Sequence, residues 1–273
     1  RGRFEVALQG FASAPEVWDV TESGSIRRLG VQAQGGAFVV QIDAAAGPRE
    51  IVAFDPASRR VFISNDPVLG PDRPSVDVVD LRNPSSPVPL PSVNLMSQGA
   101  SAVQSVAVSH GVLAVAVTLT SPQAPGAVLL YDAATSRFLR RAAVGALPDA
   151  VTFTPDGMSV VVANEGEAAC QGRTLVNPEG SVSIVDVATG SVRTANLLAY
   201  NGRKAELQQA GVRLVLPGGT VAQELEPEYS TVSADGLTAY VTLQEANAVA
   251  TVDLVTATVT AIRGAGSVDF DVV

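Results

Sequence analysis

The sequence predicts an all-β fold, a β-propeller whose blades are sheets of four antiparallel strands. Three observations lead to this prediction. One pattern of short β-branched runs separated by turn residues occurs four times. Each copy closes on an aspartate, and these aspartates recur about every 50 to 70 residues, close to the roughly 40 to 50 residues of a propeller blade with loop insertions. Repetition around a central axis leaves only short, protected sheet edges, so such a repeat favours a propeller of YVTN/WD40-like blades.

The N-terminal 50 residues carry the pattern weakly. The apolar run Ala37–Ile42 predicts strands of an incomplete blade. Clear blades are predicted near residues 50–90, 103–140, 149–195 and 226–262. Four blades and part of a fifth do not match the common closed rings. Either two degenerate blades are contained in the remainder, or residues 1–273 form one propeller domain that is an incomplete ring, a fragment of a larger propeller.

Local signals support the blades. Asp156-Gly157 and Asp235-Gly236 supply the positive φ of a tight hairpin. Helix formers bounded by glycines predict one short helix in a loop around 203–210. The closing aspartates are predicted to cap turns through their own backbone, rather than to form a ring of metal ligands. They are Asp80, Asp132, Asp186 and Asp253.

Composition excludes several functional classes. Of 273 residues 47% are hydrophobic, and 27 Asp plus Glu against 18 Lys plus Arg give a net charge of -9. This charge repels phosphate backbones, so we expect no nucleic acid partner. The single Cys170 and single His110 exclude an intrachain disulfide and the common zinc sites. We interpret both as loop residues. No apolar run approaches the roughly 20 residues of a transmembrane segment.

Acidic motifs at the blade edges are the candidate site. Glu165 and Glu167 follow a predicted strand, and Glu224, Glu226 and Glu228 precede another. In extended chain, carboxylates two residues apart lie on one side, about 6 to 7 Å apart. Such pairs suit calcium, which prefers hard oxygen ligands, or acid–base chemistry if their pKa values differ. The alternative is that they are solvated or structural loop charges.

Asp149, at the entry to a blade, joins this candidate metal cluster. We assign no catalytic and no cofactor-binding residues. No Gly-x-Ser-x-Gly motif occurs on a strand-to-helix turn, so a serine hydrolase is unsupported.

Five separated motifs resemble the choice-of-anchor I family and occur in that family's order. They are Gly145–Gly157, Ala163–Glu167, Asn177–Asp186, Glu224–Tyr229 and Tyr240–Ala248. The resemblance extends from about Glu50 to about Leu254. Two positions depart from it: Glu224 stands where the family commonly has aspartate, and Ala168 where proline is usual.

The resemblance implies a secreted or cell-surface propeller, because the family includes bacterial surface proteins and mesenchyme-specific cell-surface glycoproteins linked to biomineralisation. Family members continue into further blades, which favours the interpretation as a fragment or shortened member. The chain begins at Arg1 and shows no signal peptide, so the extracellular location rests on the resemblance.

The favoured hypothesis is a non-catalytic surface protein that binds calcium, mineral or an unknown extracellular ligand. A divalent cation is the expected partner. Some relatives are labelled alkaline phosphatases, so the alternative is a calcium-dependent phosphoesterase of the alkaline phosphatase or phytase kind. A second alternative is a scaffold for protein interactions, in which the glutamates are structural.

Overall fold

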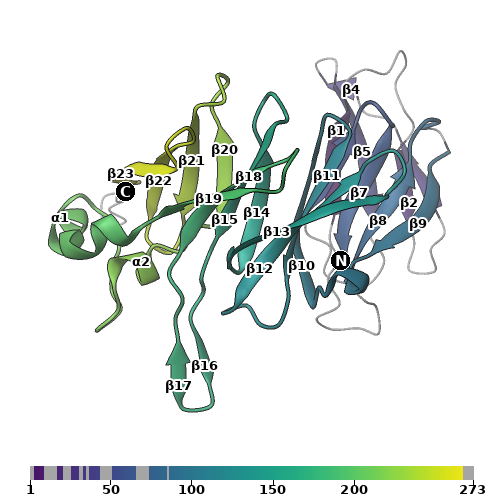
Figure 1. The fold of residues 1–273 in the computed structure, drawn as a ribbon. Coiled ribbons are helices and arrows are strands. Elements are labelled where there is room, and N and C mark those ends of the chain that lie inside the picture. The colour runs from purple at the N-terminus through teal and green to yellow at the C-terminus, as the bar shows by residue number, and fades with distance from the viewer. Residues whose placement is uncertain are drawn as a thin grey trace. The chain divides into compact units, whose positions relative to one another are not determined.

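The computed structural model describes residues 51–65, 74–84 and 86–266, and within residues 1–50 only the course of the strands. The chain divides into two compact units. The first comprises Arg1–Val115 with Leu130–Leu139, and the second comprises Ala116–Leu129 with Arg140–Val273. Figure 1 shows that the described elements are almost all strands.

The first unit begins with two small sheets, whose side chains lie outside the described residues. One has the order β1-β5-β4 and the other pairs β2 with β3. Their bounds are Arg3–Leu8 for β1, Val17–Val20 for β2, Ile26–Gly30 for β3, Ala33–Gln34 for β4 and Ala37–Asp43 for β5. The predicted strand at Ala37–Ile42 is therefore present as β5.

A four-stranded antiparallel sheet follows in the order β6-β7-β8-β9. Its strands are Val52–Asp55, Arg60–Asn65, Ser75–Asp80 and Val88–Asn94, and the short 3-10 helix η1 (Met96–Gln98) follows them. Val61, Ile63 and Leu81 form a buried cluster on this sheet. The next sheet has the order β10-β11-β12-β13, with strands Ala102–Ser109, Val112–Thr118, Pro125–Asp132 and Phe138–Ala146.

The second unit contains two further four-stranded sheets, β14-β15-β18-β19 and β20-β21-β22-β23. The first is built from Pro148–Phe153, Ser159–Asn164, Ser181–Asp186 and Val192–Asn196. The second is built from Tyr229–Val232, Thr238–Leu243, Ala248–Asp253 and Thr258–Gly264. All neighbouring strands in both sheets are antiparallel, as the sequence predicts.

Two excursions leave these sheets. Between β15 and β18, the hairpin of β16 (Ala169–Gln171) and β17 (Thr174–Val176) extends beyond the sheet (Figure 1). Between β19 and β20, the chain forms η2 (Leu198–Arg203), α1 (Lys204–Gln209) and α2 (Val221–Glu224). The helix predicted around 203–210 is confirmed as α1. The second helix, α2, was not predicted.

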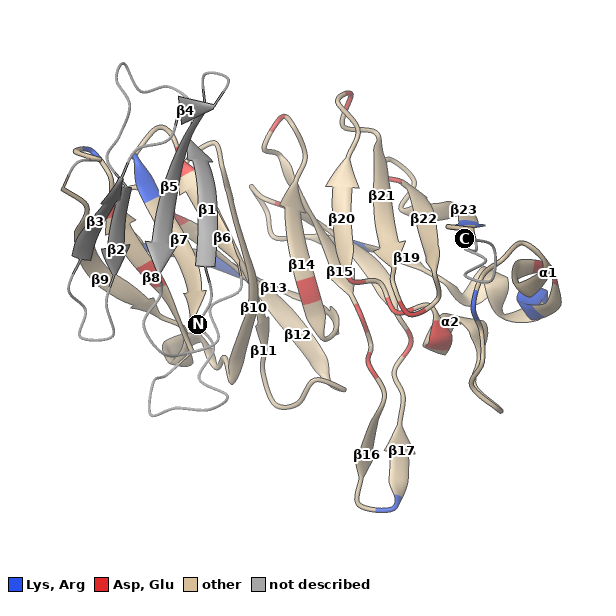
Figure 2. Ribbon diagram, turned by 180° about the vertical axis from the view of Figure 1, so that it is seen from behind, with Lys and Arg blue, Asp and Glu red and all other residues tan. Residues whose placement is uncertain are grey.

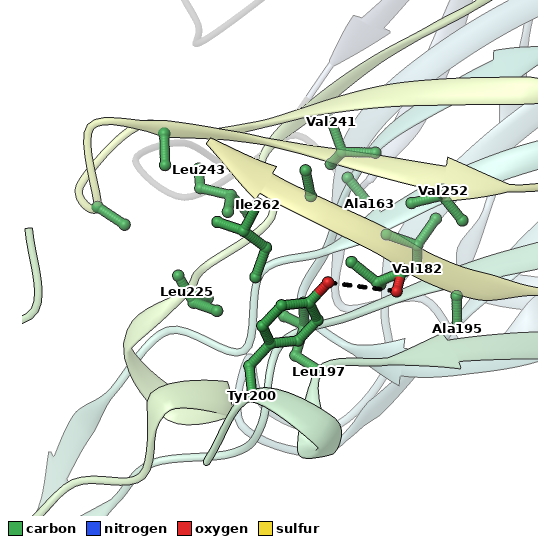
Figure 3. Close-up of a cluster of buried hydrophobic side chains, with 14 of the residues drawn as sticks. Ala163, Val182, Ala195, Leu197, Tyr200, Leu225, Val241, Leu243, Val252 and Ile262 are labelled. Carbon is green, nitrogen blue, oxygen red and sulfur yellow. Dashed lines mark hydrogen bonds between the residues drawn. The ribbon is translucent and has the colours of Figure 1, made fainter. Parts of the chain in front are cut away.

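The core of the second unit lies between its two large sheets and under the helical excursion. Alternate residues of β21 and β22 are buried, as expected for strands with one face in a core. Val241 and Leu243 belong to the same buried cluster as Ala163 and Val182 (Figure 3). Tyr200 anchors the excursion, since its ring is buried and its hydroxyl donates a 3.3 Å hydrogen bond to the carbonyl of Val259.

The closing aspartates cap turns, as predicted. Each carboxylate accepts a hydrogen bond of 2.7 to 2.9 Å from a backbone N–H two or three residues later. The pairs are Asp80–Arg82, Asp132–Thr135, Asp186–Thr189 and Asp253–Thr256. The two Asp-Gly turns also behave as predicted, because Gly157 and Gly236 have φ of 71° and 74°. His110 (φ 49°) and Cys170 are exposed.

Candidate site: an acidic pocket

Five glutamates line one pocket of about 310 Å³ in the second unit. They come from three parts of the chain: the segment that leaves β15, the segment that starts at the end of α2, and the turn between β21 and β22. In Figure 2 the acidic segments after β15 and at α2 are red. The glutamates are Glu165, Glu167, Glu224, Glu226 and Glu245, and the wall also includes Ala168, Arg213, Val215 and Leu216.

Backbone contacts hold the Glu165-Gly166-Glu167 segment in place. The N–H of Glu165 donates to the carbonyl of Leu147 at 2.8 Å, in line with the end of β15. Gly166 has φ of 71°, and a Cβ at this position would lie 3.0 Å from the carbonyl carbon of Glu179. Glycine is therefore favoured at this position, because it adopts a left-handed conformation without strain and leaves room for the neighbouring chain.

Glu224 ends a helix, so the expectation that residues 224–228 are extended is wrong at this position. Thr220 and Gln223 form a capping box, in which Gln223 accepts a 3.0 Å hydrogen bond from the N–H of Thr220. This interaction nucleates the turn of α2 (Val221–Glu224). The Thr-x-x-Gln spacing is visible in the sequence and could have indicated this helix start.

The carboxylate of Glu224 is already neutralised. Its side chain is 3% exposed and forms an ion pair with Lys204, the only lysine of the chain. Its second oxygen accepts a 2.7 Å hydrogen bond from the N–H of Leu216. A buried charge needs this kind of compensation. Glu224 therefore links α1 to the wall of the pocket and has a structural role.

Glu226 and Glu228 stand on either side of Pro227, which fixes their positions by close packing. A Cβ on Gly180 would lie 2.5 Å from the Cδ of Pro227, so this contact needs glycine. Glu226 lines the pocket. Glu228 accepts a hydrogen bond from Gln244 through Oε2, while its Oε1 is buried without a partner among the described residues.

Burial and mutual repulsion raise the pKa values of these glutamates. Burial raises the pKa of Glu165 to about 8, and Asp149 and Glu167 add repulsion. Glu226 shifts in the same direction, first through burial and then through Glu245 and Glu167.

The pKa of Glu228 is raised to about 8, first by burial and next by the neighbouring carboxyl group of Glu245. Burial of the Oε1 of Glu228 without a partner among the described residues acts in the same direction, because it disfavours the charged form. Negative charge is therefore unfavourable at Glu165, Glu226 and Glu228.

The carboxylates do not form a ready-made coordination sphere. Within the part of the chain that the structure describes, no three Asp, Glu, His or Cys side chains stand close enough together to hold a metal ion. A divalent cation would therefore require side-chain rotation. What the arrangement provides is a concave, electronegative surface that a proton or a cation would neutralise.

Of the six predicted site residues, four line the pocket: Glu165, Glu167, Glu224 and Glu226. Asp149, on β14, and Glu228 are outside its lining; Asp149 raises the pKa of Glu165 through repulsion, and Glu228 interacts electrostatically with Glu165 and Glu245. Glu245 and Arg213 were missed. Glu245 lies in the family motif Tyr240–Ala248, which could have pointed to it, whereas no local signal marks Arg213.

A comparison with protein families identifies the choice-of-anchor I domain over residues 50–273. The chain belongs to the choice-of-anchor I family. No curated protein matches the sequence. No helix in the described ranges is long and apolar enough to span a membrane. The predicted membership of this family is thus confirmed.

Solved structures resemble this family member in fold. Pseudomonas aeruginosa periplasmic gluconolactonase PpgL is 15% identical, with a TM-score of 0.55 over 98% of this chain and 70% of the other. A functionally unknown protein from Desulfotomaculum acetoxidans is 13% identical, with a TM-score of 0.53 over 83% and 59%. Kuenenia stuttgartiensis hydrazine synthase is 14% identical, with a TM-score of 0.41 over 90% and 78%, which is too low to support a shared fold. Together with the four-stranded sheets, the likeness to PpgL confirms the predicted β-propeller fold class.

Proposed function

We propose that this chain is a secreted or cell-surface, non-catalytic propeller protein that binds a cation in the acidic pocket. The observation that carries the proposal is the gathering of five glutamates around one cavity of about 310 Å³. Membership of the choice-of-anchor I family supports the surface location. A role in biomineralisation, which the family resemblance implies, remains a prediction.

The raised pKa values give the physical reason for cation binding. A carboxylate with a pKa near 8, such as Glu165, is held close to other negative charges in a partly buried place. A bound cation stabilises the ionised form of every glutamate around it. Calcium is the ion to test first, because it accepts oxygen ligands in flexible geometry. Since the carboxylates are not preorganised, we expect weak affinity, about 0.1 to 1 mM, as in other extracellular calcium modules.

The phosphoesterase alternative finds less support in the pocket. Phosphoryl transfer needs several positive groups around the transferring phosphate. Among the described lining residues Arg213 is the single cation against five glutamates. We therefore expect no phosphate release from an aryl phosphate with calcium at alkaline pH. The scaffold alternative would leave the pocket unresponsive to cations.

Calcium titration tests the proposal. The purified chain is titrated with calcium chloride by calorimetry, and its melting temperature is followed in parallel at constant ionic strength. We expect saturable heat and a rising melting temperature at millimolar calcium. The Glu165→Gln, Glu226→Gln double variant should lose both, because it removes two pocket charges.

A matched control separates the pocket from general charge effects. The Glu179→Gln, Glu206→Gln variant removes two exposed carboxylates that do not line the pocket. It should bind calcium as the unmodified chain does. The proposal fails if the unmodified chain does not respond to millimolar calcium, or if both double variants lose the response equally.

A further inference from the structure

A second groove lies along the outer edge of the last sheet. β23 (Thr258–Gly264) is the terminal strand in the order β20-β21-β22-β23, so one of its edges has no strand partner within the part of the chain that the structure describes. A cavity of about 480 Å³ follows this edge. Its opposite wall is formed by the excursion, with Tyr200, Arg203 and Leu207 among the lining residues. The groove shares no lining residue with the acidic pocket.

The register of β22 and β23 identifies the free backbone groups. The N–H of Ala265 donates to the carbonyl of Asn247 at 2.8 Å, and Ala250 stands opposite Ile262. Because hydrogen-bonded and non-bonded pairs alternate in an antiparallel ladder, Ala250 and Ile262 form a non-bonded pair. The N–H and C=O of Ile262 therefore point away from β22, into the groove. Neither group has a hydrogen-bond partner among the described residues.

Both ends of this free edge are closed. At one end the outward-facing carbonyl of Val259 already accepts a hydrogen bond from the hydroxyl of Tyr200. At the other end Ala210 covers Gly264, since a Cβ on Gly264 would lie 2.5 Å from the carbonyl oxygen of Ala210. The open part, around Ile262, lies between these two contacts. An exposed strand edge is a template for pairing with another chain.

Charge in the groove differs from charge in the rest of the molecule. Although the chain carries a net charge of -9, the groove is lined by two arginines and one glutamate. Glu206 is neutralised by Arg203, whose Nε and Nη2 donate to its two oxygens at 2.8 and 2.5 Å, and Arg203 stacks on the ring of Tyr200. Arg263, exposed on β23, supplies the remaining positive charge. Figure 2 shows blue segments at α1 and β23.

We propose that the groove between β23 and α1 binds an extended acidic peptide, which adds as a strand to the free edge at Ile262. The backbone of the peptide pairs with the N–H and C=O of Ile262, and its carboxylate approaches Arg263. Peptide recognition by strand addition uses main-chain hydrogen bonds for affinity and side-chain contacts for specificity. A glutamate-bearing strand fits a groove whose uncompensated charge is positive.

Fluorescence anisotropy tests this proposal with a defined probe, a fluorescein-labelled peptide of alternating valine and glutamate about seven residues long. We expect saturable binding in the range of about 10 μM to 1 mM. The same peptide with methylated amide nitrogens at alternate positions should not bind. Hydrogen exchange provides a local readout, because the amide of Ile262 should exchange more slowly in the presence of the probe.

Charge reversal locates the binding. Arg263→Glu should weaken the affinity about five- to tenfold, because it replaces the attraction for glutamate with repulsion. Arg173→Glu, an equal change on the exposed tip of the β16–β17 hairpin, should leave the affinity unchanged. The proposal is overturned by absence of saturable binding at millimolar peptide, by equal binding of the methylated peptide, or by equal effects of the two charge reversals.

Discussion

The acidic residues of this chain divide between two kinds of region. In the turns that close the sheets, each aspartate accepts hydrogen bonds from backbone N–H groups. For Asp132 the side chain and backbone of Thr135 lower the pKa. In the pocket, burial and neighbouring carboxylates raise the pKa of Glu165 to about 8. The same functional group is therefore stabilised as an anion in one region and destabilised in the other.

This difference separates fold from function. A turn carboxylate is compensated within three residues of its own position, so it contributes to the fold without any ligand. A pocket carboxylate meets other carboxylates brought from distant parts of the chain, and its compensation has to come from a proton, a cation or an added neighbour. Sites with such strained charge are the usual candidates for ligand binding.

The largest effect is expected at the one pocket glutamate that resembles the turn aspartates. Replacement of Lys204 by methionine leaves Glu224 buried without its cation, so we expect a loss of about 3 kcal/mol in the free energy of unfolding. Urea denaturation at neutral pH measures it. Adding Glu224→Gln to this variant should recover part of the loss. An unchanged stability for Lys204→Met would show that the ion pair between Lys204 and Glu224 has no structural role.

The pocket should also respond to alkaline pH. The pKa of Glu165 is about 8 in the folded state against 4.5 for an unperturbed glutamate, so the folded chain binds this proton more tightly. The resulting stability is full below about pH 4.5, declines as the pH rises and is lost above about pH 8.

We therefore expect Glu165→Gln to be more stable than the unmodified chain at pH 9 and not at pH 5. Because the side chain is partly exposed, water screens the charge, and the gain should be reduced to about 2 kcal/mol. Urea denaturation at the two pH values measures it. An equal effect at both pH values would contradict the raised pKa.

Gly166 tests how the pocket is held. Gly166→Ala forces an alanine into a left-handed conformation and places its Cβ 3.0 Å from Glu179. We expect a loss of about 1 to 2 kcal/mol, together with weaker calcium binding. Gly172→Ala is the matched control, since Gly172 has φ of 66° but no atom within 4 Å of the added Cβ. Gly172→Ala should lower the free energy of unfolding by less and leave calcium binding unchanged. If the two variants lose the same stability and the same calcium affinity, the contact with Glu179 does not hold the pocket in place.

The smallest effect is expected in the turns. Asp132→Ala removes the hydrogen bonds from Thr135, measured at 2.8 and 2.6 Å, and should cost at most about 1 kcal/mol. Because the pKa of Asp132 is lowered, its stabilisation is present above pH 3.8 and is lost as the pH falls further. Melting temperatures of the two proteins should therefore differ at pH 7 and converge near pH 2. Loss of the calcium response in Asp132→Ala would contradict the distinction between turn aspartates and pocket glutamates.

Much of the fold could be predicted from the sequence because its signals are local. The alternating strands, the Asp-Gly turns and the glycine-bounded helix α1 follow from residues close to one another. The site was predicted only in part. The four predicted glutamates that line the pocket lie in motifs near the ends of elements, whereas Glu245 and Arg213 join them from other turns and segments. The helical end at Glu224 was missed because the Thr220 capping box was overlooked.

The sequence by itself determined the repeated antiparallel sheets, the acidic balance and the family, since these depend on residue order and composition. Only the tertiary structure decided which charges meet. It paired the single lysine with Glu224, set five glutamates around one cavity, and placed two arginines beside an edge of β23 that has no partner strand among the described residues. The physical reason is that the pKa of a carboxylate depends on burial and on neighbours within a few ångströms. Those neighbours come from segments far apart in the chain.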